Sequence, residues 1–184
     1  FNTPARRKFL KTAATEFGHI TEQLARLALP HPQIAFTLRH NGRDALNLPA
    51  CQTTQQRIAD LFTPDLAENL IPIPQRNGTA TINGLIGTPA AARSSAKWQY
   101  VFLNGRFIRD RLINHAIKEG YRGRLMPTRC PVVFIFIDIA PDEVDVNVHP
   151  TKIEVRFRDS NSVYGSVLAA LKEEGSKIRT LVVS

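Results

Sequence analysis

The chain has 184 residues, of which 43% are hydrophobic, and its formal net charge is +8 at pH 7. A chain of this length can bury a sizeable core as one domain. We expect neither a membrane helix nor a secretory signal, because no apolar run reaches roughly 18 residues and no signal-peptide pattern opens the chain. Because it starts without Met, we expect an excised piece of a longer protein.

The positive charge is concentrated in one part of the chain. Residues 93–129 hold nine basic and two acidic groups, a net charge of +7, whereas residues 130–184 hold six basic and eight acidic groups, a net charge of −2. A positive patch of this kind favours a polyanion as partner. Cys51 and Cys130 lie far apart without a CxxC motif, so we expect two buried thiols of a cytosolic protein and no metal site.

A helix is predicted near the start of the chain, with Thr3 as N-cap and Pro4 in the first turn. Its basic first turns oppose the helix dipole and predict a phosphate or an acidic partner surface nearby, with a solvated basic end as the alternative. These basic residues are Arg6, Arg7, Lys8 and Lys11. The predicted core stripe, at three- and four-residue steps, is Phe9, Ala13, Phe17, Ile20, Leu24 and Leu27.

Alternating apolar residues around Asn41-Gly42 and Asn104-Gly105 predict two hairpins, because both residue types tolerate a positive φ. The elements expected between these hairpins are a short helix at Thr53–Phe62, strands at Leu70–Pro74 and Thr79–Gly87 with a bulge at Gly84, and a mobile loop at 88–96.

A second amphipathic helix is predicted from Arg111 to about Tyr121, with Asp110 as its N-cap. Its polar face carries Arg111, Asn114 or His115, Lys118 and Arg122. Pro131–Ile139 reads as a strand buried on both faces, and a last helix is expected from Ser160 to about Glu174. This order predicts an α/β (α+β type) fold with one mixed sheet and helices mainly on one face.

The stretch DVNVHPTKIEVRF, residues 145–157, holds the most informative polar residues. Val144, Val146 and Val148 alternate with polar residues as in a half-buried strand, and a second short strand is expected from Ile153 to Phe157. Pro150 ends the first strand because it has no N–H to donate. Lys152 then lies on a short loop between two strands, where it is either a functional cation or a solvated turn residue.

No catalytic set is visible in the sequence. The chain has no G-x-S-x-G, H-E-x-x-H or P-loop pattern, its carboxylates are scattered, and most of its histidines are isolated. We therefore expect no enzymatic activity from this chain alone.

Three segments resemble motifs of the MutL-type DNA mismatch-repair proteins. They are FNTPARRKFL (Phe1–Leu10), YVFLNGRFIRDRLINHAI (Tyr100–Ile117) and DVNVHPTKIEVRF, and they occur in the order found in the family. The resemblance implies that residues 1–184 are one transducer-like domain, the second domain of the ATPase region. It also implies the fold of a small-subunit ribosomal protein's second domain, with a left-handed βαβ crossover against the general rule.

The resemblance implies that the parent is an ATPase of the GHKL class, whose ATP and Mg²⁺ pocket lies mainly in a preceding domain that this chain lacks. Lys152, after H-P, is then expected to reach the γ-phosphate and to act in catalysis. Residues 1–12 would form the interdomain junction. Expected to serve interdomain or structural roles are Pro4, Arg6, Arg7, Lys8, Asn147, His149 and Pro150.

The resemblance also implies DNA repair in a bacterial cytoplasm, with nonspecific binding of single- or double-stranded DNA. Arg111 matches a family arginine implicated in DNA binding, and charge alone adds Arg106, Arg109, Lys118, Arg122 and Arg124. Expected partners of the parent are the missing ATPase domain, a mismatch-recognition protein, a helicase or nuclease and a second copy of itself. The alternatives are a stand-alone nucleic-acid-binding module and the transducer domain of a type II topoisomerase.

Overall fold

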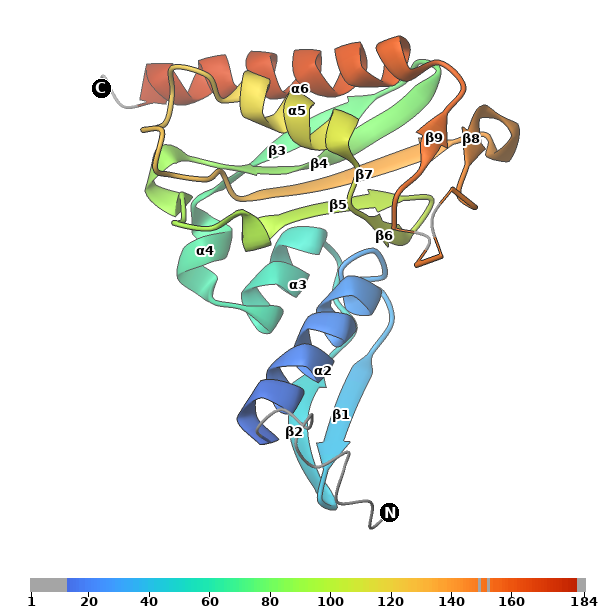
Figure 1. Ribbon diagram of the computed structural model, residues 1–184. Helices are drawn as coiled ribbons and strands as arrows, with labels where there is room; N and C mark the ends of the chain where they lie inside the picture. Colours follow the sequence, from blue (N-terminus) through green and yellow to red (C-terminus); the bar gives the residue numbers. More distant parts are fainter. Residues whose placement is uncertain (1–12, 149, 152, 182–184) are drawn as a thin grey trace.

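The computed structural model describes residues 13–148, 150–151 and 153–181. Five strands form one sheet, and two pairs of shorter strands lie apart from it (Figure 1). The α-helices are α2 (Ala13–Ala28), α3 (Thr54–Leu61), α4 (Pro64–Glu68), α5 (Arg111–Gly120) and α6 (Ser160–Leu181). The strands are β1 (Phe36–His40), β2 (Arg43–Leu48), β3 (Leu70–Arg76), β4 (Ala80–Gly87), β5 (Gln99–Leu103), β6 (Arg106–Ile108), β7 (Val133–Ile139), β8 (Val144–Asp145) and β9 (Arg156–Phe157).

The predicted mixed sheet is confirmed. Its strand order is β3-β4-β7-β5-β6, in which β5 and β7 are parallel and the other neighbours are antiparallel. The central strand is β7, which the sequence predicted as a buried strand from its run of apolar residues. The connection from β5 to β7 passes through β6 and α5, and its left-handed crossover stays a prediction.

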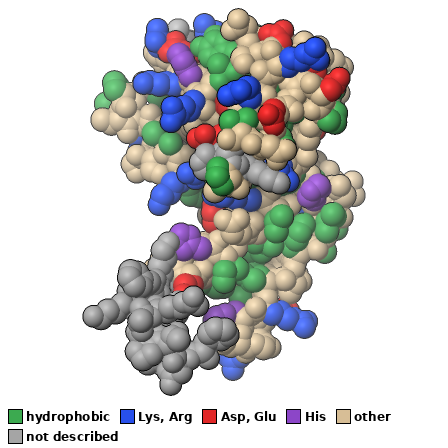
Figure 2. Space-filling view, turned by 45° about the vertical axis from the view of Figure 1, so that its right-hand side comes forward, with side chains coloured by type: hydrophobic (Ala, Val, Ile, Leu, Met, Phe, Trp, Pro, Cys, Tyr) green, Lys and Arg blue, Asp and Glu red, His purple; other side chains and the backbone are tan. Residues whose placement is uncertain are grey.

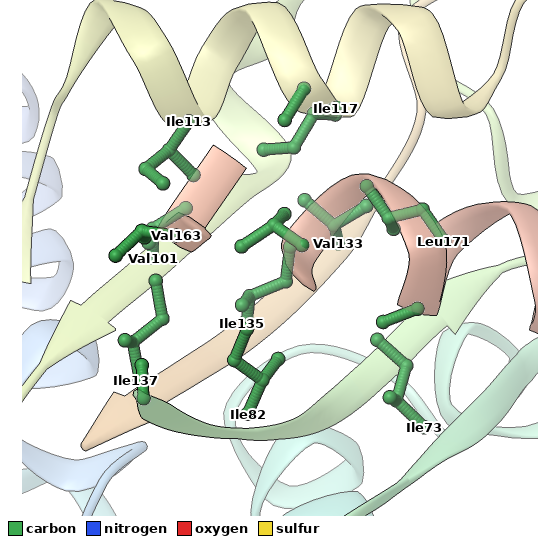
Figure 3. Packing of buried hydrophobic residues seen from close by; sticks show 14 of the residues in the cluster. Ile73, Ile82, Val101, Ile113, Ile117, Val133, Ile135, Ile137, Val163 and Leu171 are labelled. Carbon is green, nitrogen blue, oxygen red and sulfur yellow. The ribbon is translucent and has the colours of Figure 1, made fainter. Parts of the chain in front are cut away.

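Successive residues of β7 serve two different cores because strand side chains alternate between faces. Val133, Ile135 and Ile137 belong to the core beneath α5 and α6, which Figure 3 shows from close by. Phe134 belongs to the core of the opposite face, where its ring stacks on Tyr100 at a centroid distance of 5.4 Å. Helices α3 and α4 and the end of α2 cover this second face, so the sheet carries helices on both sides (Figure 1).

Gly84 of β4 lies against the backbone of β7, where it pairs with Ile135. A Cβ there would come within 2.0 Å of the Phe134 carbonyl oxygen, and its φ of +152° is one that L side chains rarely adopt. The register shift that we predicted at Gly84 falls on the neighbouring strand β3, between Ile73 and Arg76. The sequence thus predicted an irregularity in this strand pair, but the extra residue belongs to β3 and not to β4.

Helix α2 and the β1–β2 hairpin extend away from the five-stranded sheet (Figure 1). We call residues 13–48 the α2–hairpin unit and the described residues of 54–181 the sheet body. The predicted core stripe of α2 is wrong for Phe17, Ile20 and Leu27, whose exposures are 36, 45 and 61%. The core on this face of the sheet takes in Ala25 and Leu29 at the C-terminal end of α2, whereas Phe17 in an earlier turn contacts the His40 ring of the hairpin. Phe9 lies outside these residues.

Asp110 caps α5 as predicted: its carboxylate accepts hydrogen bonds from the backbone N–H groups of Leu112 (2.9 Å) and Ile113 (3.1 Å). Asp110→Ala should therefore destabilise the fold by about 1 kcal/mol. Burial raises the pKa of Asp110 above 3.8, more than these two hydrogen bonds lower it, and nearby Glu154 raises it further. The stability that this carboxyl contributes through protonation is complete below its unfolded pKa and is lost as pH rises through the folded pKa.

Asp110→Asn keeps an acceptor for the cap without that ionisation. Thermal unfolding at pH 4 and pH 7 tests both points. The Asn variant should gain stability relative to the native chain as pH rises, and an unchanged difference between the two would contradict the raised pKa.

Candidate functional site

The loop that carries Lys152 is fastened at both ends. Strand β8 pairs with β9, and the Arg158 N–H donates to the Glu143 carbonyl oxygen at 2.8 Å. The Arg109 N–H donates to the Ile153 carbonyl oxygen at 2.9 Å, which ties the loop to the end of β6. Lys152 itself lies outside the described residues, as does His149.

The two strands that we predicted around this loop are shorter than expected. Pairing is limited to Val144–Asp145 and Arg156–Phe157. The reason is local, because the Asp145 carboxylate accepts the Asn147 N–H at 2.9 Å and so turns the chain out of the ladder. Asn147 and Pro150 are exposed on this loop, and their scaffolding roles stay predictions.

A groove of about 600 Å³ separates α2 from the lysine loop and the edge of the sheet. Thr151 and Ile153, the neighbours of Lys152 on either side, both line it. The cationic lining residues are Arg26 and Arg106. The remaining lining residues are Gln23, Leu27, Gly105 and Phe107. The α2–hairpin unit and the lysine loop thus face each other across a groove whose charged side chains are positive.

A small polar network joins α2 to the sheet body beside this groove. The Tyr100 hydroxyl donates to the Glu22 carboxylate at 2.7 Å, and Arg26 Nε donates to the same carboxylate at 3.2 Å. Burial, with help from Glu22, raises the pKa of Tyr100, which keeps its hydroxyl a donor. The Arg26 guanidinium lies 4.0 Å from the Phe107 ring centroid. Sequence reasoning missed this network, and its only signal was the four-residue spacing of Glu22 and Arg26.

The predicted DNA-binding residues fall into two neighbouring groups. Arg111 and Lys118 are exposed on α5 and Arg122 in the turn that follows it. Arg106 and Arg109 are exposed at β6, where Arg106 lines the groove. Arg122 pairs with Glu119 at 2.6 Å, which partly neutralises it. In the view of Figure 2, lysine and arginine side chains lie over the upper part of the molecule, interspersed with acidic ones.

Arg124 does not belong to this free cationic surface. Its guanidinium donates to the carbonyl oxygens of Gly120 (3.0 Å), Leu171 (3.1 Å) and Lys172 (2.9 Å). It also packs over Gly175, where a Cβ would clash with it. We predicted Arg124 as a DNA-binding residue from its charge alone. In the structure its guanidinium instead holds the end of α5 against α6.

The remaining predicted junction residues, Pro4, Arg6, Arg7 and Lys8, lie outside the described residues. Within residues 13–148, 150–151 and 153–181, no three His, Cys, Asp or Glu side chains gather as they would around a metal ion. None of the helices in the same residues combines the length and apolar character needed to cross a membrane. Cys51 and Cys130 are free thiols, but both are partly exposed, so the prediction that they are buried is wrong.

Comparison with known proteins places these features in one family. The family profile described as DNA mismatch repair protein, C-terminal domain, matches residues 58–175. The MutL mismatch repair protein of Neisseria meningitidis serogroup C / serotype 2a is 45% identical over 173 residues, which cover 94% of this chain and 26% of that protein. MutL of Thiobacillus denitrificans is 46% identical over 164 residues, which cover 89% and 27%.

Solved structures agree on the fold. A crystal structure of the N terminal domain of a DNA repair protein superimposes with a TM-score of 0.76 at 18% identity, over 96% of this chain and 58% of that one. The Aquifex aeolicus MutL ATPase domain complexed with ADP gives a TM-score of 0.55 at 24% identity, over 77% and 50%. The chain spans about a quarter of the length of its curated relatives. The profile match and these relatives confirm the resemblance read from the three sequence motifs: the chain belongs to the MutL family of DNA mismatch repair proteins.

Proposed function

We propose that this chain is the part of a mismatch-repair ATPase that senses bound nucleotide through Lys152 and binds DNA through α5 and β6. The observation that carries the proposal is the groove between α2 and the lysine loop, because Thr151 and Ile153 line it. Lys152 stands between these two residues in the sequence and is proposed to contact an anion in the groove, where Arg26 and Arg106 favour phosphate.

The nucleotide itself is proposed to bind mainly in the remainder of the parent protein. An ammonium group at the γ-phosphate would stabilise the charge that develops during phosphoryl transfer. The contact would exist only while the γ-phosphate is present, which links the nucleotide state to the position of the sheet body. The Mg²⁺ ion is proposed to bind with the nucleotide in that remainder.

The exposed apolar stripe of α2 supports the proposal that the nucleotide-binding part of the parent protein lies outside this chain. Phe17, Ile20 and Leu27 are large side chains in water, and a two-stranded hairpin such as β1–β2 is marginal by itself. We propose that the nucleotide-binding remainder of the parent packs on this side of the α2–hairpin unit. The basic junction residues Arg6, Arg7 and Lys8 would then serve that interface.

DNA binding is proposed to be sequence-independent. Arg106, Arg109, Arg111, Lys118 and Arg122 would neutralise phosphates and release counterions, which gives affinity that falls steeply with salt. A base-stacking module for RNA is less well supported, because the aromatic rings of the sheet are buried: Tyr100, Phe102 and Phe134 lie in the core under α3 and α4. For the whole parent we propose a homodimer that acts in the bacterial cytoplasm with a mismatch-recognition protein and a helicase or nuclease.

A salt series of duplex and single-strand DNA binding tests the DNA surface. Arg111→Glu should weaken binding about tenfold at low salt, and it should flatten the dependence of log K on log salt because fewer counterions are released. Arg43→Glu is the matched control: Arg43 is also exposed but lies on the distant hairpin, so this variant should bind like the native chain. Equal losses in both variants would point to net charge alone, and no loss in Arg111→Glu would reject the surface.

A further inference from the structure

Arg57 on α3 is a fully buried arginine that has no carboxylate partner among the described residues. Its Nη2 donates to the carbonyl oxygens of Pro32 (2.7 Å) and Ile34 (2.6 Å). The guanidinium lies 5.7 Å from the centroid of the Phe36 ring. Its Nε and Nη1 are also buried, and neither meets an acceptor in the part of the chain that the structure describes.

Two connecting segments meet at this arginine, one within the α2–hairpin unit and one between that unit and the sheet body. Residues 29–35 lead from α2 to β1, and residues 49–53 lead from β2 to α3. The Pro32 carbonyl oxygen accepts hydrogen bonds from Arg57, from the Cys51 N–H (2.9 Å) and from the Cys51 thiol (3.5 Å). One carbonyl therefore ties both connecting segments to α3.

The contacts further along α2 are of a different kind. Tyr100 with Glu22 and Arg26 with Phe107 join α2 to the sheet body through single side chains, and Arg26 and Phe107 line the groove of about 600 Å³. That groove leaves room for α2 to approach the lysine loop. Such an approach would be a rotation of the α2–hairpin unit relative to the sheet body. Its axis would run through the connecting segments and pass Arg57.

A buried guanidinium with unused donors is costly compared with an apolar side chain of similar size. Its fixed fork offers donors in several directions at once, which a lysine does not. We propose that Arg57 is the pivot between the α2–hairpin unit and the sheet body. In the arrangement seen here, Nη2 donates to carbonyl oxygens of the connecting segments. In a second arrangement of the two parts, Nε and Nη1 donate to carbonyl oxygens of these segments instead. Arg57 is a positioning residue that relays nucleotide state to the DNA surface, and this role rests on the proposed function.

The test uses the full-length parent protein with Arg57→Lys, which keeps the charge but loses the fork. The matched control is Arg124→Lys, because Arg124 also donates to backbone carbonyls but joins two helices within the sheet body. The measurements are ATP turnover, equilibrium affinity for a non-hydrolysable ATP analogue, and hydrogen exchange of the amides in residues 33–36 with and without that analogue.

For Arg57→Lys we expect turnover about tenfold lower, analogue affinity within about twofold of native, and loss of the analogue-induced change in exchange at residues 33–36. Arg124→Lys should keep all three near native. The pivot would be overturned if Arg57→Lys kept the native analogue-induced change in hydrogen exchange. It would also be overturned if Arg57→Lys and Arg124→Lys lost turnover equally, in proportion to their lower melting temperatures. If Arg57→Lys does not fold, Arg57→Gln, a neutral donor, carries the same measurements.

Lys152→Ala in the same series separates this proposal from the one on which it rests. If Lys152→Ala leaves turnover unchanged, nucleotide sensing by that lysine fails. The hydrogen-exchange comparison at residues 33–36 still decides whether Arg57 is a pivot, because it measures movement rather than hydrolysis.

Discussion

ATP turnover by the full-length parent should fall about 100-fold when Lys152 is replaced by alanine. Removing one preorganised donor or charge from a developing oxyanion typically costs two to three orders of magnitude in rate. The loss should appear in kcat, because the contact strengthens as charge builds on the transferred phosphoryl group. Steady-state hydrolysis, together with the equilibrium affinity for a non-hydrolysable analogue, measures the two effects separately.

Lys172→Ala provides the matched control for this experiment. Lys172 is exposed on α6 and contributes only its carbonyl oxygen to Arg124, so the substitution removes the same charge without a new contact loss. Its turnover should stay native. Lys152→Arg should recover only part of the activity, because a planar fork does not replace a compact ammonium group. A native rate in Lys152→Ala would reject nucleotide sensing by this loop.

The largest effect on stability is expected for Gly84→Ala. The new Cβ would have to displace the Phe134 carbonyl in the middle of the sheet, and the residue would have to keep a φ of +152°. Backbone strain and overpacking together predict a loss of at least about 3 kcal/mol. For a chain of this size, that corresponds to a melting temperature lower by about 6 to 12 °C.

Gly165→Ala separates this effect from a general cost of replacing glycine. Gly165 is exposed on α6 with nothing within 4 Å of its added Cβ, so alanine should stabilise the helix by up to about 1 kcal/mol. Urea unfolding of the chain with each substitution gives the comparison. Equal stability of Gly84→Ala and the native chain would mean that β4 and β7 separate more easily than their close approach implies.

The sheet could be predicted because its residues follow local rules. Asn41 and Asn104 adopt positive φ values of 51° and 49°, as Asn-Gly turns require, and β7 was marked by its apolar run. The stripe on α2 was a different case. Its period correctly indicated a helix, but period alone does not say whether the apolar partner lies within the described part of the chain, and Phe17 and Leu27 are exposed there.

Residues of the candidate site could be predicted only where they belong to a recognisable sequence motif. Lys152 and Arg111 came from resemblance, whereas the pairing of Glu22 with Tyr100 joins residues 78 positions apart and has no periodic signal. No sequence signal distinguished Arg57 within its short helix, and only the fold shows that both connecting segments meet at it. Arg124 counted as free charge because a sequence cannot show a guanidinium saturated by carbonyl oxygens.

The central place of β7 in the sheet has a consequence for how the chain is synthesised. Strands β3 and β4 form one hairpin and β5 and β6 another, and both are complete before β7 is translated. Until then, β4 and β5 each keep an open edge that can pair with another chain. The nascent chain therefore passes through a stage with two unpaired strand edges. Both edges become paired when β7 inserts between β4 and β5. Chaperone demand should be greatest in that interval.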